Sequence, residues 1–164
     1  MKSIMKRTFA LFLANVLLAG CALAQDNPMA KSLTLAQGRH TSYVIALAAD
    51  AIPAEKTAAR QLQKYLHEVT GATFPVQPES DVDASTPQIL VGLGERAKTL
   101  LPRQDWSTLG ADGIVIKTVG NKLILAGGRP RGTLYAVFQF LEESAGCRWW
   151  TPTESTIPRR STLE

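Results

Sequence analysis

The sequence contains little of what cross-links a small secreted domain or binds a metal ion. It has two cysteines, Cys21 and Cys147, and two histidines, His40 and His67. Cys21 belongs to the leader described below, so we expect Cys147 to lack a disulfide partner and to be a buried, small apolar side chain. Neither histidine has a Cys, His or Asp residue at metal-ligand spacing. We therefore predict no internal disulfide and no metal site.

A strong net charge is also missing once the leader is set aside. The 164 residues carry 18 basic and 14 acidic side chains, a net charge of +4. Three of the basic residues, Lys2, Lys6 and Arg7, lie in the leader, which has no acidic residue, so 15 basic side chains remain against 14 acidic ones. A nearly neutral domain lacks the electrostatic footprint of a nucleic-acid-binding protein. We expect no nucleic-acid partner.

The N-terminal residues have the pattern of an export signal. The positive residues precede the apolar run Thr8–Ala19, about a dozen residues where a bilayer span needs roughly 20. Residues 18–21, Leu-Ala-Gly-Cys, resemble a bacterial lipobox, which implies a signal peptide over 1–20 and a diacylglycerol on Cys21. Ala22-Leu23-Ala24 offers an ordinary signal-peptidase site instead. Both alternatives predict an exported protein, either lipid-anchored in the cell envelope or free in the periplasm or medium.

Strands and helices alternate after a polar linker over residues 21–32. The apolar, β-branched run Ser42–Ala48 predicts a buried strand. Pro53 suits the first turn of a helix, whose apolar stripe continues to Gly71. Shorter elements are expected as strands at 73–76, 88–91 and 147–150, a loop over 79–87, a short helix over 92–101 and an amphipathic helix from about 130 to 146.

A β-hairpin is predicted over residues 113–126. Gly113–Val119 and Lys122–Ala126 flank the two-residue turn Gly120-Asn121, and both turn residues tolerate the positive φ of a type I′ turn. That turn fixes the register of the hairpin. The expected pairs are Val119 with Lys122, Thr118 with Leu123, and Ile116 with Leu125.

These elements predict a single α/β domain of the α+β sandwich type. It has a small mixed β-sheet with two main amphipathic helices packed on one face. After Pro152 the composition turns polar, and we expect no closing element before Glu164. We therefore expect the folded domain at 33–158 and assign residues 159–164 to the truncated start of another segment, as in a fragment of a longer protein.

A glycine pattern typical of dinucleotide-binding turns follows the strand at 88–91. Residues 92–97, Gly-Leu-Gly-Glu-Arg-Ala, match the form G-x-G-x-x-A. However, Glu95 places a negative charge where a phosphate would bind, and the acidic residue expected about 20 positions later, at the end of a second strand, is missing. We interpret the pattern as a tight strand-to-helix turn and predict no cofactor.

Catalytic groups are not evident either. Glu142 and Glu143 are neighbours on a helix and point in different directions, whereas glycoside hydrolysis needs two carboxylates facing one bond. No serine lies in a nucleophile-elbow pattern. We predict no catalytic residue in this chain and expect the two glutamates on a solvated helix face.

Two local patterns suggest contacts with a glycan or with another domain. Arg129 and Arg131 lie in the glycine-rich segment 127–132 at a helix start, where backbone N–H and guanidinium groups suit a carboxylate or phosphate. Alternatively, the glycines only form a corner, and the arginines are solvated or pair with another domain. Trp149 and Trp150 are adjacent on a strand and so point to opposite faces. One of them at most packs in the core, which leaves the other for solvent, a sugar ring or another domain.

The segment from Leu123 to Pro152 resembles a known family. A glycine-rich turn leads into a helix that begins Arg131-Gly132-Thr133-Leu134-Tyr135, and Gly-Cys-Arg-Trp-Trp-Thr-Pro follows the helix. These motifs, with the helix around 58–69 and Asp112-Gly113 before the hairpin, are similar to the N-terminal domain of α-glucuronidases. They are also similar to the related domain that precedes the barrel of β-N-acetylhexosaminidases. The resemblance spans roughly Leu33 to Pro158.

This resemblance implies a non-catalytic accessory domain of an exported carbohydrate-active enzyme. The implied partner is a (β/α)8 catalytic domain C-terminal to it in the parent protein, whose own strand ends carry the acids that act on polysaccharide-derived glycans. The alternative is a self-standing carbohydrate-binding surface lipoprotein that uses Arg129, Arg131, Trp149 or Trp150.

Overall fold

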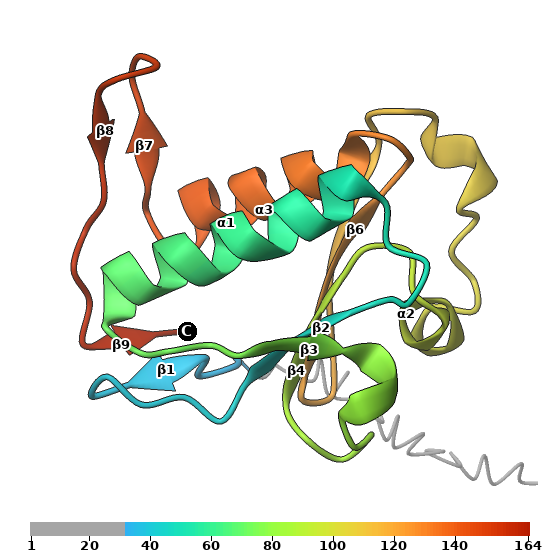
Figure 1. Ribbon diagram of the computed structural model, residues 1–164, viewed down its shortest axis with the longest axis horizontal. Helices are drawn as coiled ribbons and strands as arrows, with labels where there is room; N and C mark the ends of the chain where they lie inside the picture. The colour runs from blue at the N-terminus through green and yellow to red at the C-terminus, as the bar shows by residue number, and fades with distance from the viewer. Residues whose placement is uncertain (1–31) are drawn as a thin grey trace, which may run out of the picture. The chain divides into compact units, whose positions relative to one another are not determined.

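A five-stranded sheet in the order β3-β2-β4-β6-β5 forms the centre of the domain (Figure 1). The computed structural model describes residues 32–164, so the leader, Cys21 and nearly all of the predicted linker lie outside the described residues. Strands β3, β2, β4 and β6 run parallel, and β5 is antiparallel to β6, which confirms the predicted mixed sheet. The strands are β2 (Val44–Leu47), β3 (Val76–Pro78), β4 (Gln88–Val91), β5 (Ile114–Val119) and β6 (Lys122–Gly127).

The two long helices cover one face of this sheet. Helix α1 (Pro53–Thr70) connects β2 to β3, and α3 (Gly132–Glu143) follows β6; they pack side by side (Figure 1). Their apolar stripes meet strand residues such as Ile45, Ile89 and Leu125, none of which is exposed. This burial removes a continuous apolar surface from water, the main favourable contribution to folding. The predicted arrangement of two helices on one face is confirmed.

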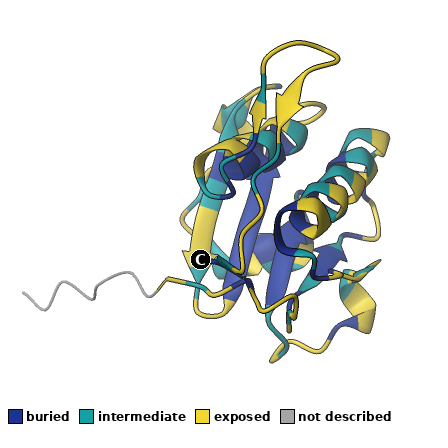
Figure 2. Cartoon of the chain, turned by 90° about the vertical axis from the view of Figure 1, so that its left-hand side faces the viewer, coloured by how far each residue is buried: buried dark blue, intermediate teal, exposed yellow. Residues whose placement is uncertain are grey.

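The opposite face of the sheet is also covered, by shorter elements. Successive strand residues point to opposite faces, so Ala46, Leu90 and Ile124 form a second apolar cluster with Ala97 of α2 (Glu95–Leu100). The short helices η1 (Glu79–Asp81) and η2 (Ser107–Leu109) lie in the connections around it. The central strands are therefore buried on both faces (Figure 2), as parallel strands usually are. No helix within residues 32–164 is long and apolar enough to cross a membrane.

The predicted hairpin is confirmed residue by residue. Strands β5 and β6 pair with Val119 opposite Lys122, Thr118 opposite Leu123 and Ile116 opposite Leu125. Gly120 has φ +57°, a left-handed conformation that costs glycine little, but Asn121 does not have a positive φ. The register is therefore as expected, whereas the predicted type I′ turn is wrong, because a positive φ at the first turn residue alone is the pattern of a type II′ turn.

The third strand begins three residues later than predicted. A strand was expected over 73–76, but β3 spans Val76–Pro78. Phe74 is fully buried, and its carbonyl accepts a hydrogen bond from Nε2 of Gln63 at 2.7 Å, so this apolar residue packs under α1 before the strand begins. Pro78 is tolerated because β3 is an edge strand of the sheet.

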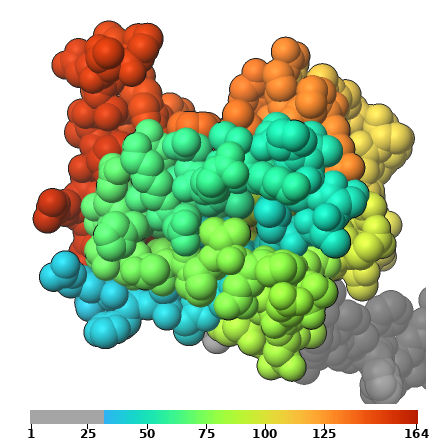
Figure 3. Space-filling model, in the orientation of Figure 1, coloured from blue at the N-terminus to red at the C-terminus, as the bar shows by residue number. Residues whose placement is uncertain are grey.

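The C-terminal segment contributes strands to two small sheets. β7 (Arg148–Trp149) and β8 (Ser155–Thr156) form an arm that projects from the body at the upper left of Figures 1 and 3. β9 (Thr162–Leu163) pairs antiparallel with β1 (Ala36–Gln37).

The expectation that no element closes the domain after Pro152 is therefore wrong. Leu163 is 1% exposed and belongs to the main core cluster. The sequence did not show this because a two-residue strand with one apolar side chain has no periodicity to detect. The domain boundary at residue 158 stays a prediction, with β9 now placed beyond it.

Candidate functional site

The glycines of segment 127–132 serve close backbone packing. A Cβ atom on Gly128 would overlap the carbonyl oxygen of Gly110, and one on Gly127 would overlap the backbone of Gly132. The turn therefore brings the start of α3 against the end of β6 and the loop before β5. The corner predicted as the alternative for this motif is present.

Arg129 lies in a charge cluster that this domain supplies itself. Its guanidinium donates to both carboxylate oxygens of Glu55, at 3.1 and 3.2 Å, and to the carboxylate of Asp50 at 3.1 Å. The Glu55 side chain is 1% exposed and also accepts the backbone N–H of Ile52 at the start of α1. The hydrogen bonds that Arg129 donates to Glu55 raise the pKa of Arg129 above its ordinary value. Arg129 thus neutralises a buried carboxylate.

Arg131 is held by a second carboxylate on the surface. It forms a bidentate pair with Asp112, at 2.7 and 2.8 Å, and this pair raises the pKa of Arg131. Both side chains are more than half exposed. The structure thus gives both predicted arginines partners inside the domain, and their contact with a glycan or another domain stays a prediction.

The glycine pattern at 92–97 forms a tight turn between β4 and α2. The backbone N–H of Arg96, in the first turn of α2, donates to the carboxylate of Glu79 at 2.9 Å. That carboxylate also occupies the space beside Gly94, where a Cβ atom would overlap it. A side chain of this domain therefore takes the position that a phosphate would need. The strand-to-helix turn is confirmed, and Glu79 was not predicted because it lies on a different connection.

The two adjacent tryptophans point to opposite sides, as predicted. Trp149 is half-buried and packs edge-on against Phe138 and Tyr65, with ring centroids 4.9 and 5.1 Å apart. Its indole N–H donates to the Tyr65 hydroxyl at 3.2 Å. Trp150 is 63% exposed on the arm, where its indole N–H donates to Thr156. Trp149 therefore fixes the base of the arm, and contact of the exposed Trp150 with a sugar ring or another domain stays a prediction.

The remaining side chains that could carry chemistry are either buried and held by this domain or exposed on its surface. Cys147 is fully buried, as predicted, and burial raises the pKa of its thiol, which disfavours the reactive thiolate. Burial, with Arg96 nearby, lowers the pKa of Lys122, whose ammonium donates to the Thr86 carbonyl. Glu142 and Glu143 are exposed, as expected. Within residues 32–164, no group of three or more His, Cys, Asp or Glu side chains is placed to hold a metal ion.

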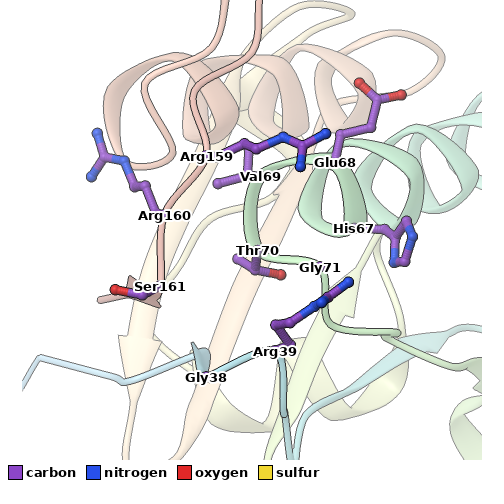
Figure 4. Close-up of a pocket in the computed structure, with 10 residues that line it drawn as sticks. All are labelled: Gly38, Arg39, His67, Glu68, Val69, Thr70, Gly71, Arg159, Arg160 and Ser161. Atoms are coloured by element: carbon purple, nitrogen blue, oxygen red, sulfur yellow. The ribbon is translucent and has the colours of Figure 1, made fainter.

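A pocket at the C-terminal end of α1 was not predicted from the sequence. It has a volume of about 520 Å³, and three distant segments form it: the turn at 38–39, the end of α1 at 67–71, and residues 159–161 (Figure 4). Backbone hydrogen bonds of 2.8 Å join them, from Arg160 N–H to the Val69 carbonyl and from Gly38 N–H to the Ser161 carbonyl. No local sequence pattern indicates this pocket, because its three segments meet only in the folded chain.

Arginine is the dominant side chain around this pocket. Arg39, Arg159 and Arg160 line it, all exposed, together with His67 and Glu68. In Figure 4, Arg39 and Arg159 reach toward the end of α1 from two sides, whereas Arg160 points away. In the part of the chain that the structure describes, none of the three guanidinium groups has a hydrogen-bond or ion-pair partner, whereas Glu68 lies 3.9 Å from Lys64.

Arg39 also has an unusual backbone conformation. With Gly38 it forms the two-residue turn between Gln37 and His40, and its φ is +70°. A left-handed conformation costs a side chain other than glycine about 1 kcal/mol or more. Residues with backbone strain of this kind cluster at ligand-binding and active sites. The pocket is thus the strongest candidate site of the domain, and its groups suit binding of an anion rather than catalysis.

The fold and the candidate site together define a small α/β domain with a surface pocket that suits an anionic ligand. Residues 28–140 match the family described as glycosyl hydrolase family 67 N-terminus. This match covers more than half of the chain, so the chain belongs to that family and confirms the resemblance found in the sequence. It is also similar to "Probable alpha-glucuronidase A" of Aspergillus terreus, with 27% identity over 103 residues. The alignment covers 63% of this chain and 12% of the length of that protein.

Proposed function

We propose that this chain is a non-catalytic accessory domain of an exported carbohydrate-active enzyme of the α-glucuronidase type. The observation that carries this proposal is the family match over residues 28–140, which extends from before β1 into α3. In the proposed parent protein, a (β/α)8 catalytic domain follows this one and acts on polysaccharide-derived glycans. The accessory domain supports that barrel, and the acids that break the bond belong to the barrel.

The geometry of the acidic residues supports a non-catalytic role. Glu55 is neutralised by Arg129, Asp112 by Arg131, and Glu79 caps α2. Each of these carboxylates already accepts hydrogen bonds from groups of this domain, whereas glycoside hydrolysis needs two carboxylates that are directed at one glycosidic bond. They stabilise turns and helix starts.

The purified chain should release no glucuronic acid from an α-glucuronide substrate. The same assay on a protein that joins the chain to its downstream catalytic domain should show activity. Turnover by the chain alone, lost on replacing one of its own glutamates by glutamine, would overturn the proposal. So would a stop codon directly after the codon for Glu164 in the gene, because no barrel would then follow.

Export is part of the same proposal, and it rests on the leader over residues 1–20. If the lipobox at 18–21 is used, cells that express the chain incorporate labelled fatty acid into it, and the Cys21→Ser variant does not. Export without label supports the ordinary cleavage site after Ala24. Retention of the uncleaved chain in the cytoplasm contradicts export altogether.

One observation favours a second function, a self-standing carbohydrate-binding surface lipoprotein. Trp150 is 63% exposed on a projecting arm, where an indole face is free to stack on a sugar ring. A glycan array probed with the chain and with its Trp150→Ala variant tests this alternative. Binding by the parent chain that is lost in the Trp150→Ala variant supports the carbohydrate-binding function. An array on which the parent chain gives no signal excludes it.

A further inference from the structure

We propose that the pocket at the end of α1 binds the carboxylate of an acidic sugar, a hexuronic acid unit of a glycan. The pocket consists of the turn at 38–39, residues 67–71 and residues 159–161. The guanidinium groups of Arg39 and Arg159 would bind the carboxylate. Arg160, whose side chain points away from the end of α1, adds positive charge at the edge of the pocket. The pocket alone supports a preference for an anionic ligand. That this anion is a sugar acid rests on the proposed function.

The arginines are not needed to complete the helix end. The Leu66 carbonyl accepts the Thr70 hydroxyl, and the Val69 carbonyl accepts the N–H of Arg160. The His67 carbonyl accepts the N–H of Gly71, the left-handed residue that ends α1. Because these carbonyls already have donors, the guanidinium groups are not occupied in capping the helix. Arg129 and Arg131 contrast with them, since carboxylates of the domain hold both.

The charges around the pocket favour an anion. Three guanidinium groups stand against one carboxylate, Glu68, which is shared with Lys64. A planar guanidinium matches a carboxylate with two parallel hydrogen bonds, and this match distinguishes an acidic sugar from a neutral one. No aromatic ring other than His67 lines the pocket. Recognition must therefore depend on charge and hydrogen bonds rather than on stacking.

The size and rigidity of the pocket suit a small ligand. Its volume of about 520 Å³ lies within the roughly 300–1,000 Å³ typical of small-molecule sites. The backbone hydrogen bonds at Val69 and Ser161 hold its three segments together before any ligand arrives. A preformed site loses less conformational freedom on binding. The Ser161 hydroxyl and Nε2 of His67 offer further partners for sugar hydroxyl groups, whereas the buried Thr70 hydroxyl is already used within the helix end.

The test is a titration of the full chain, followed by NMR amide shifts and calorimetry. The probes are glucuronic acid, glucose, acetate and inorganic phosphate. We expect glucuronic acid to bind and to shift the amides of Arg39, Gly71 and Arg160, and we expect glucose to cause no shift. Binding should weaken as salt is added, because exposed charges are screened. Acetate or phosphate that binds as tightly as glucuronic acid would overturn the assignment to a sugar.

Three variants make the test specific. Arg39→Gly removes a guanidinium and also relieves the strained turn, so it should fold at least as well as the parent and bind about tenfold more weakly. Glu68→Gln removes the opposing carboxylate and should bind more tightly. Arg60→Gln, an exposed arginine on α1 outside the pocket, is the matched control and should bind as the parent does. Unchanged binding by Arg39→Gly contradicts the proposal.

This experiment is independent of the test of the proposed function. If glucuronic acid fails to bind but the catalytic domain needs this domain for activity, the accessory role stands and the pocket proposal fails. If glucuronic acid binds but the chain alone cleaves an α-glucuronide, the pocket proposal stands and the non-catalytic role fails.

Discussion

Replacing Arg129 by alanine should lower the free energy of unfolding by about 3 kcal/mol. The substitution leaves the Glu55 carboxylate, 1% exposed, without the guanidinium that neutralises it. A buried charge without a partner costs far more than the loss of a surface contact, because the surrounding protein replaces water poorly. Urea denaturation of the full chain, followed by circular dichroism, measures the difference.

Arg131→Ala is the matched control, because it removes a bidentate pair from the same turn. Arg131 and Asp112 are both more than half exposed, so water takes over their hydrogen bonds and only a small fraction of the effect of Arg129→Ala is expected. Equal losses from the two variants would show that the turn, not the buried charge, determines stability. The double variant Arg129→Met with Glu55→Gln should recover much of the loss, because no buried charge then remains.

Replacing Leu163 by alanine should cost about 3 kcal/mol, comparable with truncation of leucine in a protein core. Leu163 is 1% exposed and lies in β9, and its backbone carbonyl accepts the N–H of Leu35 at 2.8 Å. The loss of methyl groups there leaves a cavity between the first and last strands of the domain. Thermal and urea unfolding of the full chain provide the measurement.

The exposed neighbour Glu164 offers the control for this prediction. Glu164→Ala should change stability little, since no packed surface is lost. A cost for Leu163→Ala no larger than that for Glu164→Ala contradicts the placement of β9 in the core. It would also favour the boundary at residue 158 that the composition alone suggested.

The parts of the fold that were predictable depend on local periodicity. The alternation around Gly120-Asn121 fixed a hairpin register that the structure reproduces pair by pair. The spacing of apolar residues after Pro53 located α1, and the adjacency of Trp149 and Trp150 placed them on opposite sides. In each case neighbours in the sequence determine the geometry, so one short window contains the whole signal.

The parts that were missed depend on pairs that are distant in the sequence. Glu55 and Arg129 meet across 74 positions, and Glu79 caps α2 from a separate connection 17 positions away. A residue's charge is visible in the sequence, but its partner is not until the chain has folded. The arginine pocket is the extreme case, since Arg39 and Arg159 come from opposite ends of the domain. The pairing of β1 with β9 was not predicted for the same reason, because the two strands lie at opposite ends of the domain sequence.

That pairing has a consequence for the order in which parts of the domain become ordered. The five-stranded sheet and both long helices lie in the sequence between β1 and β9, and they do not include the residues that line the pocket from 38–39 and 159–161. The main sheet and its helices can therefore pack first, and the proposed ability to bind an anion arises only when β9 pairs with β1.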